Sequence, residues 1–385
     1  MEFTISMRRH FNDKKMSNIS SESMVDCQNS ITFALDSLKL TIMKRSLTIV
    51  LTVFLLCIPS KYCFAQTDVK WKSLGSYYEG LSCAADANGK YGYIDKTGKV
   101  VIPCQWRYAL DFSEGLACVK EAIGKIGFID KTGKLVIPCQ LKSLGSFSEG
   151  LVGIMDASGK YGYIDKTGKV VIPCQWESVG TFNQGRAYVR DASGKYGFID
   201  KTGKVVIPCQ WKSAGEYSEG LAYVKDTSGE YGYIDMQGMI QIPCQWNSAG
   251  DFHEGLAYVE DSDEKYGFID KKGTIVCACQ WKSAGEYSEG LARVGDFNDK
   301  WGFIDKTGKL VIPCQWEAAG NFSEGLACVR DANDKYGYID KTGKVVIPCQ
   351  WRYAAEFHEG LAYIEDFSGN YFHIDKTGKI IRGEW

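Results

Sequence analysis

Aspartate recurs at one position of a 35-residue period, from Asp95 through Asp375, each time after an isoleucine and before a turn. Regularly spaced Asp and Gly residues bind rows of calcium ions in some β-repeat proteins. A calcium loop needs several acidic ligands, however, and the residues that follow here are mostly Lys, Thr and Gly. An aspartate that opens a turn also accepts hydrogen bonds from nearby backbone N–H groups. We therefore interpret these aspartates as turn residues and predict no metal site.

Histidine forms no recognisable catalytic motif in this chain. His10 lies near the start, His253 and His358 occupy a slot that is usually serine in the other copies, and His373 lies in the divergent last copy. No serine or cysteine nucleophile is paired with a histidine at a known spacing, and only a triad assembled in space stays open. We expect no enzyme activity, no catalytic residue and no cofactor.

Cysteine forms a second periodic column, with one residue in each of eight copies. The column consists of Cys104, Cys139, Cys174, Cys209, Cys244, Cys279, Cys314 and Cys349. Such a column pairs between neighbouring copies or not at all, and a disulfide needs Cα atoms within about 7 Å. Stacked three-stranded units are expected to be further apart, which favours buried and unpaired thiols. A partial column, Cys83, Cys118 and Cys328, leaves local bridges such as Cys104 to Cys118 open, and Cys277 with Cys279 lacks the partner ligands of a zinc site.

Tryptophan forms a third column that would suit either a hydrophobic core or a stacking surface for a sugar or peptide. Its members include Trp71, Trp106, Trp176 and Trp211, and Leu141 interrupts it. Leucine keeps apolar volume but has no π face, so this exception favours the core.

These columns belong to nine copies of one 35-residue unit that run from Trp71 without an insertion. Three segments of each copy, typified by L-A-Y-V, Y-G-Y-I and V-V-I, are rich in β-branched and aromatic residues, and we predict three strands. Hairpin-length links with glycine join them, and proline ends the third strand or marks it as an edge. An aromatic residue, a glycine three residues later (Gly115, Gly220), the Ile-Asp pair and a turn glycine fill all nine copies. Positions that carry the same type of residue in every copy indicate a structural role rather than a single catalytic site.

The predicted fold class is all-β: nine three-stranded β meanders stacked into an open, curved or superhelical solenoid. The alternative is a closed, propeller-like array. Propellers typically have four to eight blades of four strands, which nine units of three strands fit poorly.

The segment Lys300-Trp301-Gly302-Phe303-Ile304-Asp305 carries a resemblance to a known family. With Gly308 in the following turn, the segment resembles the WG-repeat family, also called KWG repeats, and the resemblance spans Trp71 to Trp385. Other copies have tyrosine or isoleucine in place of Trp301. The resemblance implies a bacterial β-repeat protein, often associated with the cell envelope, without a generally assigned reaction.

The first part of the chain reads as a processing segment. Lys44 and Arg45 precede an apolar run from Leu47 to Ile58, and Cys63-Phe64-Ala65 forms a small-residue cleavage site before Gln66. We expect residues 1–42 to be an upstream extension, 43–65 a signal peptide and 66–385 the repeat domain. The apolar run is too short to span a bilayer comfortably, although an uncleaved amphipathic anchor stays open. The protein is therefore expected to be periplasmic, cell-surface or secreted, with no integral membrane span in the mature chain.

The balance of positive and negative charge argues against nucleic acid and anionic lipid as partners. A formal net charge of −2 creates no field that would attract nucleic acid or anionic lipid. We expect an exported, non-catalytic protein that binds or scaffolds a protein or glycan partner at the cell envelope. The alternative is a cell-envelope hydrolase or a metal-dependent adhesin, which would show one copy with clustered acidic or histidine residues, and no copy does so clearly. The partner's identity and the oligomeric state are not determined by the sequence.

Overall fold

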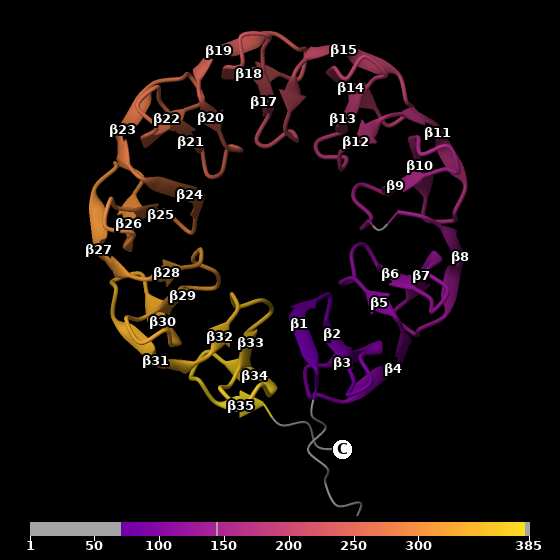
Figure 1. The fold of residues 1–385 in the computed structure, drawn as a ribbon, viewed down its shortest axis with the longest axis vertical. Helices are drawn as coiled ribbons and strands as arrows, with labels where there is room; N and C mark the ends of the chain where they lie inside the picture. The colour runs from indigo at the N-terminus through magenta and orange to yellow at the C-terminus, as the bar shows by residue number, and fades with distance from the viewer. Residues whose placement is uncertain (1–70, 144, 382–385) are drawn as a thin grey trace, which may run out of the picture. The chain divides into compact units, whose positions relative to one another are not determined.

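The computed structural model describes residues 71–143 and 145–381, which fold into nine antiparallel sheets, here called blades. The first blade contains β1 (Ser73–Tyr78), β2 (Leu81–Ala85), β3 (Tyr91–Asp95) and β4 (Val100–Trp106), paired in that order. Figure 1 shows β1 on the inner side of the ring and β4 at its perimeter. The expected leader segments, 1–42 and 43–65, lie outside the described residues.

The other blades repeat this order along the chain, except that the third has no inner strand among the described residues. The second and third contain β5 (Tyr108–Ala109), β6 (Leu116–Lys120), β7 (Ile126–Asp130), β8 (Leu135–Leu141), β9 (Leu151–Met155), β10 (Tyr161–Asp165) and β11 (Val170–Trp176). The fourth and fifth contain β12 (Ser178–Val179), β13 (Arg186–Arg190), β14 (Tyr196–Asp200), β15 (Val205–Trp211), β16 (Ser213–Ala214), β17 (Leu221–Lys225), β18 (Tyr231–Asp235) and β19 (Ile240–Trp246). The sixth and seventh contain β20 (Ser248–Ala249), β21 (Leu256–Glu260), β22 (Tyr266–Asp270), β23 (Ile275–Trp281), β24 (Ser283–Ser288), β25 (Leu291–Gly295), β26 (Trp301–Asp305) and β27 (Leu310–Trp316). The eighth and ninth contain β28 (Ala318–Ala319), β29 (Leu326–Arg330), β30 (Tyr336–Asp340), β31 (Val345–Trp351), β32 (Tyr353–Ala354), β33 (Leu361–Glu365), β34 (Tyr371–Asp375) and β35 (Ile380–Ile381).

The prediction of three strands in each copy is wrong by one strand for eight of the nine copies, whereas the third blade has three strands among the described residues. The link that the sequence indicated as a packed loop contains a further inner strand, such as β16, whose Ser213 and Ala214 pair with Lys225 and Val224. A strand of two residues is too short to show an alternating pattern, so periodicity did not reveal it. The outer strand also runs through its proline to a tryptophan, as β15 does from Val205 to Trp211. Proline is tolerated there because this strand is the edge of the sheet.

The repeated aspartates open turns, as the sequence indicated. Asp200 Oδ1 accepts hydrogen bonds from the backbone N–H groups of Thr202 (2.9 Å) and Lys204 (3.1 Å) and from the Thr202 hydroxyl (2.6 Å). Gly203 follows with a φ of 86°, a conformation that glycine adopts without steric cost. These contacts hold the β14–β15 hairpin locally.

The nine blades form a closed ring, so the main prediction of an open solenoid is wrong and the closed, propeller-like alternative is right (Figure 1). The first blade packs on the ninth: Trp71 and Leu74 share a hydrophobic cluster with Tyr363 and Tyr371. Every blade is built from one continuous stretch of chain, so closure uses side-by-side contacts rather than a strand exchanged between the two ends. Closure depends on the rotation between neighbouring blades, which no single repeat specifies.

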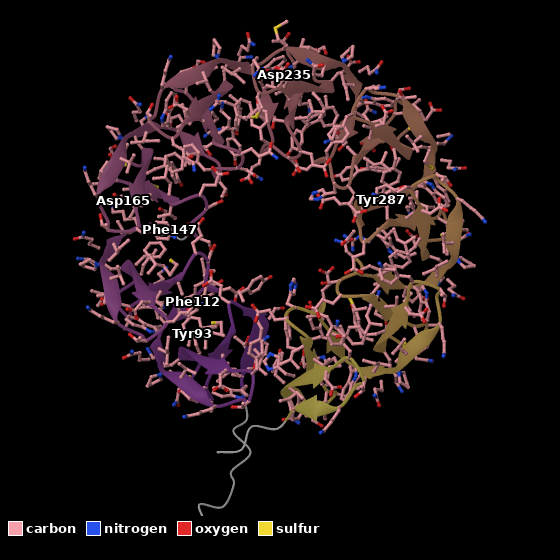
Figure 2. The ribbon with its side chains drawn as sticks, turned by 180° about the vertical axis from the view of Figure 1, so that it is seen from behind. Tyr93, Phe112, Phe147, Asp165, Asp235 and Tyr287 are labelled. Atoms are coloured by element: carbon pink, nitrogen blue, oxygen red, sulfur yellow. The ribbon has the colours of Figure 1, made fainter. Side chains whose placement is uncertain are left out.

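The hydrophobic core lies between neighbouring blades rather than within each blade. In one cluster Tyr233 and Ile242 of the fifth blade pack against Phe252, Val259 and Ile269 of the sixth. The Tyr233 and Phe252 rings lie edge to face with centroids 4.8 Å apart. Figure 2 shows the corresponding aromatic residues Tyr93 and Phe112 beside each other in the first two blades. Each blade therefore depends on its neighbour for most of its buried apolar surface.

Candidate functional site

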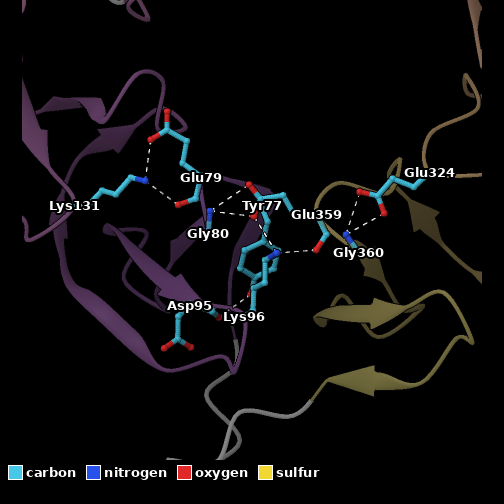
Figure 3. A network of polar contacts seen from close by, with 9 residues as sticks. All are labelled: Tyr77, Glu79, Gly80, Asp95, Lys96, Lys131, Glu324, Glu359 and Gly360. Carbon is cyan, nitrogen blue, oxygen red and sulfur yellow. Dashed lines mark hydrogen bonds and ion pairs between the residues drawn. The ribbon is translucent and has the colours of Figure 1, made fainter.

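A repeated set of polar contacts links each blade to the next. These contacts belong to the scaffold of the ring, and the candidate functional residues lie elsewhere. Glu79 accepts the backbone N–H of Gly115 in the next blade, with Oε2 3.1 Å from the nitrogen, and forms an ion pair with Lys131 at 3.0 Å. Lys131 Nζ also donates to the Glu79 carbonyl at 3.0 Å (Figure 3). We call this arrangement the inter-blade clamp. The clamp residues are Glu79, Glu114, Glu149, Gln184, Glu219, Glu254, Glu289, Glu324 and Glu359.

Each clamp residue has a backbone conformation that is unusual for a residue with a side chain. Glu79 has a φ of 53° and the following Gly80 has a φ of 85°. These values are typical of a type I′ turn, which usually has Asn-Gly at its centre. A non-glycine residue with a positive φ is strained, and such strain persists only where the surrounding structure offsets it. The clamp contacts provide that offset.

One clamp differs from the others, and both of its partners differ together. Gln184 Oε1 accepts the N–H of Gly220 at 2.8 Å, so the backbone contact is kept. The position that carries lysine in the other copies is here Met236. The carboxylate and its cation are therefore lost as a pair, which leaves no uncompensated charge. Sequence reasoning noted the glycine of this column but missed the glutamate before it.

The residues that the sequence singled out are distributed around the ring and do not form one site. Gly115 and Gly220 receive clamp contacts, Trp176 and Trp211 are buried, and Trp106 and Trp301 are half-buried. Ile304 is fully buried in the core and Asp305 opens a turn. A Cβ atom built on Gly302 would lie 2.5 Å from the carbonyl oxygen of Ile312, so the outer strand excludes any side chain there. Gly308 has a φ of 81°, and its Cβ position lies 3.0 Å from Cys277 of the preceding blade.

The cysteine column is half-buried rather than fully buried. All twelve cysteines of the described residues are free thiols, and the local bridges left open by the sequence are not formed among them. Cys104 Sγ lies 3.7 Å from the carbonyl oxygen of Ala84 in the same blade. Burial raises the pKa of Cys314 and Cys349 to about 11, with a further contribution from a nearby aspartate in each case. These thiols are poor nucleophiles at neutral pH.

Two positions that vary from copy to copy lie toward the inner side of the ring. The position before the inner aromatic residue carries Ser76, Asp111, Ser146, Thr181, Glu216, Asp251, Glu286, Asn321 and Glu356. Glu286 lies on β24, which is an inner strand in Figure 1. The third residue of the next strand carries Cys83, Cys118, Gly153, Tyr188, Tyr223, Tyr258, Arg293, Cys328 and Tyr363. In a repeat protein, identical positions build the scaffold, so varied positions are the candidates for recognition.

At these two positions, three consecutive blade interfaces combine a tyrosine of one copy with a carboxylate of the next copy. We call Glu216, Asp251 and Glu286 the rim acids, and Tyr188, Tyr223 and Tyr258 the rim tyrosines. Burial raises the pKa of Tyr223 to about 12, and Asp251 and the two neighbouring rim tyrosines add to the effect. Burial also raises the pKa of Tyr188, with a further contribution from Glu216. The rim acids and rim tyrosines therefore form one continuous electrostatic environment, which we call the arc.

Asp251, His253 and Glu286 form a compact cluster within this arc. One ligand atom from each lies within 4.8 Å of the other two. His253 Nε2 lies 3.1 Å from Glu286 Oε2, and Asp251 Oδ1 is buried without a hydrogen-bond partner. Burial and the negative charge of Glu286 raise the pKa of Asp251 to about 6. Such a mixed oxygen and nitrogen set is of the kind that holds a divalent cation. The sequence did not reveal this cluster as one copy with several acidic or histidine residues, because Glu286 belongs to the next blade.

Three cavities lie where the rim tyrosine is replaced by a small residue. A cavity of about 190 Å³ lies at Gly153, one of about 370 Å³ at Cys328 and one of about 200 Å³ at Cys83. Each has at least one tyrosine in its wall, and each includes a carboxylate: Glu216, Glu356 and Asp111, respectively. The absent phenol ring leaves the space, while the neighbouring aromatic wall is retained.

Comparison with solved structures finds likenesses at low sequence identity. A computationally designed protein, Ika8, is 10% identical and covers 80% of this chain and 96% of its own, with a TM-score of 0.43. BamB from Moraxella catarrhalis is 12% identical and covers 68% of this chain and 93% of its own, also at 0.43. PorZ, described as a surface component of the type-IX secretion system of Porphyromonas gingivalis, is 10% identical and covers 81% of this chain and 51% of its own, at 0.31. These TM-scores are too low to transfer a function.

Comparison with curated proteins finds no match. The family model for the WG containing repeat, in contrast, matches eight times, at residues 91–122, 126–158, 161–195, 196–227, 231–265, 266–301, 301–336 and 336–371. These matches cover most of the ring, and they contain the segment from Trp301 to Asp305 that suggested the resemblance. The chain therefore belongs to the family of proteins with WG containing repeats.

Proposed function

We propose that this protein is an exported, non-catalytic binding or scaffolding ring for a protein or glycan partner at the cell envelope. One observation carries the proposal: residues that recur in most copies form the clamps and the core, while residues that vary form the tyrosine-walled cavities of the inner rim. Tyrosine suits recognition because its ring gives apolar contact area and its hydroxyl gives a polar one. A ring also holds such residues on rigid strands, which reduces the entropy lost on binding.

The proposal of export rests on the processing segment before Gln66, with its basic start, apolar run and small-residue cleavage site. Within the described residues, no helix has the length and hydropathy to cross a bilayer. Sequencing the N-terminus of the protein purified from its native host tests this point. A terminus near Gln66 supports export, and an intact Met1 on the folded cellular protein contradicts it.

A variant with filled cavities tests the binding function. Cys83→Tyr, Gly153→Tyr and Cys328→Tyr place at each cavity the tyrosine that four other copies have at this position. Val179→Ala is added because Val179 Cγ2 lies 3.1 Å from the Cβ position of Gly153, and most other copies have alanine there. Residues 66–385 of both forms are used as bait in envelope extracts, and circular dichroism verifies that the variant folds. A partner retained by the natural ring and lost by the folded variant supports the proposal, and identical retention contradicts it.

A second candidate function, a metal-dependent adhesin, is favoured by the cluster of Asp251, His253 and Glu286. Calorimetric titration with Zn²⁺ and with Ca²⁺ tests it against His253→Ala. His358→Ala is the matched control because His358 occupies the same slot in the ninth copy. Saturable binding that only His253→Ala removes supports this function, and the absence of saturable binding contradicts it.

A further inference from the structure

The cavity at Gly153 occupies the space that a tyrosine ring fills in other copies. In the following copies the ring of the rim tyrosine lies against a glycine: a Cβ atom built on Gly180 would lie 2.4 Å from Tyr188 Cε1. The third blade keeps the glycine, Gly145, but has Gly153 where the ring would begin. The third blade therefore has the space that would hold a planar or elongated side chain, but it has no side chain to fill it. The resulting cavity of about 190 Å³ is partly open to solvent.

The walls of this cavity combine aromatic rings with one carboxylate. Tyr161, Tyr163 and Tyr188 line it together with Glu216 and Thr181. The Tyr163 hydroxyl donates to the carbonyl of Gly180 at 2.7 Å, which fixes the ring in the wall. Glu216 Oε1 accepts the backbone N–H of Thr181 at 2.9 Å, which holds the carboxylate at the cavity. Rings beside a fixed carboxylate are the surroundings that bind an ammonium or guanidinium group.

Negative charge continues from the cavity along the inner rim. The next two blades place Asp251 and Glu286 beside Tyr223 and Tyr258, and Glu286 and Glu216 both act to raise the pKa of the Asp251 carboxyl. His253 acts in the opposite direction on Asp251. The arc ends where the column changes to Arg293, whose guanidinium lies over the Trp301 ring and donates to the carbonyl of Ala319 at 2.7 Å. Partly buried carboxylates that repel one another are stabilised by a cation from a partner.

We propose that the Gly153 cavity and the rim acids bind an extended basic segment of a protein partner. A lysine or arginine side chain enters the cavity between Tyr161 and Tyr188, with its charge beside Glu216. Further basic side chains of the segment lie along the rim tyrosines near Asp251 and Glu286. This inference rests on the proposed binding function and names the chemistry of its partner. A neutral glycan fits less well because its hydroxyl groups leave the repulsion between the rim acids in place.

Defined peptides test the inference without knowledge of the natural partner. The probe is the capped peptide acetyl-Lys-Gly-Lys-Gly-Lys-amide, its twin has glutamine in place of each lysine, and chitohexaose represents a neutral glycan. Calorimetric titration into residues 66–385 is expected to show affinity for the lysine peptide at least about tenfold above that for the glutamine twin, as desolvated cation–π contacts and charge pairing require. This preference is expected to shrink as the salt concentration rises. Equal binding of the two peptides, or saturable binding of chitohexaose alone, would overturn the inference.

Three variants locate the site. Gly153→Tyr with Val179→Ala fills the cavity in the manner of the neighbouring copies, and Glu216→Gln removes the charge while keeping an acceptor for the Thr181 N–H. Each is expected to weaken binding of the lysine peptide about tenfold, the cost of losing one charge-assisted contact. Glu317→Gln is the matched control, since it also removes one carboxylate charge, but Glu317 pairs with Lys300 and lines none of the three cavities. Its effect is expected to stay within about twofold because distant sites act independently, and an equal loss in Glu216→Gln and Glu317→Gln would overturn the inference.

The peptide experiment and the bait experiment fail independently. If the natural ring retains a partner that the cavity-filled variant loses, but prefers no lysine peptide, the binding function stands and the basic-segment inference falls. If the lysine peptide binds at the arc while both baits retain identical partners, the inference about chemistry stands and the proposed cellular function falls.

Discussion

Glu359 of the last blade accepts the backbone N–H of Gly80 in the first blade, with Oε2 3.0 Å from the nitrogen, although 279 residues separate them. The same carboxylate pairs with Lys96 at 3.0 Å. Glu79 makes the corresponding contacts with Gly115, 36 residues further on, and with Lys131. Figure 3 shows the contacts of Glu359 with Gly80 and Lys96 across the junction between the chain ends, and the contacts between Glu79 and Lys131. The junction is therefore chemically the same as an internal blade interface.

Glu359→Ala is expected to lower the free energy of unfolding by about 1 kcal/mol, because it removes a charge-assisted hydrogen bond at a partly exposed site. Urea unfolding measures the change. Glu114→Ala at an internal interface is the control and is expected to cost a similar amount. A cost at Glu114 with none at Glu359 would contradict a closed ring.

The natural pair Gln184 and Met236 predicts a compensating double substitution at the junction. Glu359→Gln combined with Lys96→Met is expected to be close to neutral, because the Gly80 N–H keeps an acceptor and no charge is left unpaired. Lys96→Met alone is expected to cost more than the double variant. A double-mutant cycle measures the coupling, and strictly additive costs would show that the two side chains act independently.

His373 gives the ring a stability that depends on pH. Its ring is buried against Tyr77, its Nε2 lies 3.0 Å from the carbonyl oxygen of Gly75, and burial lowers its pKa from 6.5 to about 4. Between these values the unfolded chain binds a proton that the folded ring does not. The contribution of His373 to stability is therefore nearly complete at pH 7 and falls as the pH falls toward 4, by about 2 kcal/mol between pH 7 and pH 5.

His373→Tyr is expected to remove this dependence, because other copies have tyrosine there and the Tyr338 hydroxyl makes the corresponding bond to Ala355 at 2.7 Å. Urea unfolding at pH 7 and pH 5 measures the difference. His358→Asn, at a partly exposed histidine, is the control and should leave the dependence in place. An unchanged pH dependence in His373→Tyr would contradict the assignment.

Gly302→Ala is expected to destabilise the protein by about 3 kcal/mol, because the added methyl group would meet the Ile312 carbonyl of the outer strand and force the backbone apart. Gly295→Ala in the same blade is the control. Its Cβ position lies 3.3 Å from the Ser283 Cβ, so it is expected to cost less. Thermal unfolding compares the two variants, and equal costs would contradict the steric explanation.

The thiols of the folded ring are expected to react slowly with iodoacetamide at pH 7.5. Burial raises the pKa of Cys118 and Cys328 to about 11, which leaves little thiolate at that pH. Mass spectrometry of residues 66–385 should find all twelve cysteines modified after unfolding without a reductant and few modified before it. Resistance of most of them after unfolding would reveal disulfides.

The sequence alone determined the content of one repeat. The β-branched and aromatic content indicated the longer strands, Asp200 and Gly203 indicated a hairpin with local hydrogen bonds and a positive φ, and the recurrence at 35 residues indicated a repeat architecture. These features depend on neighbours along the chain, so a single copy contains the information. The two-residue inner strands were missed because they are held by pairing rather than by their own pattern.

Only the tertiary structure decided how the copies meet. The glutamate of each clamp binds a glycine in the next blade, and Asp251 and His253 meet Glu286 across a blade interface. Whether nine blades close or continue as a solenoid depends on a small rotation that each interface contributes and that accumulates around the array. No residue of one repeat encodes the total rotation, so the sequence is compatible with an open array. The contact between Glu359 and Gly80 shows that the array is closed.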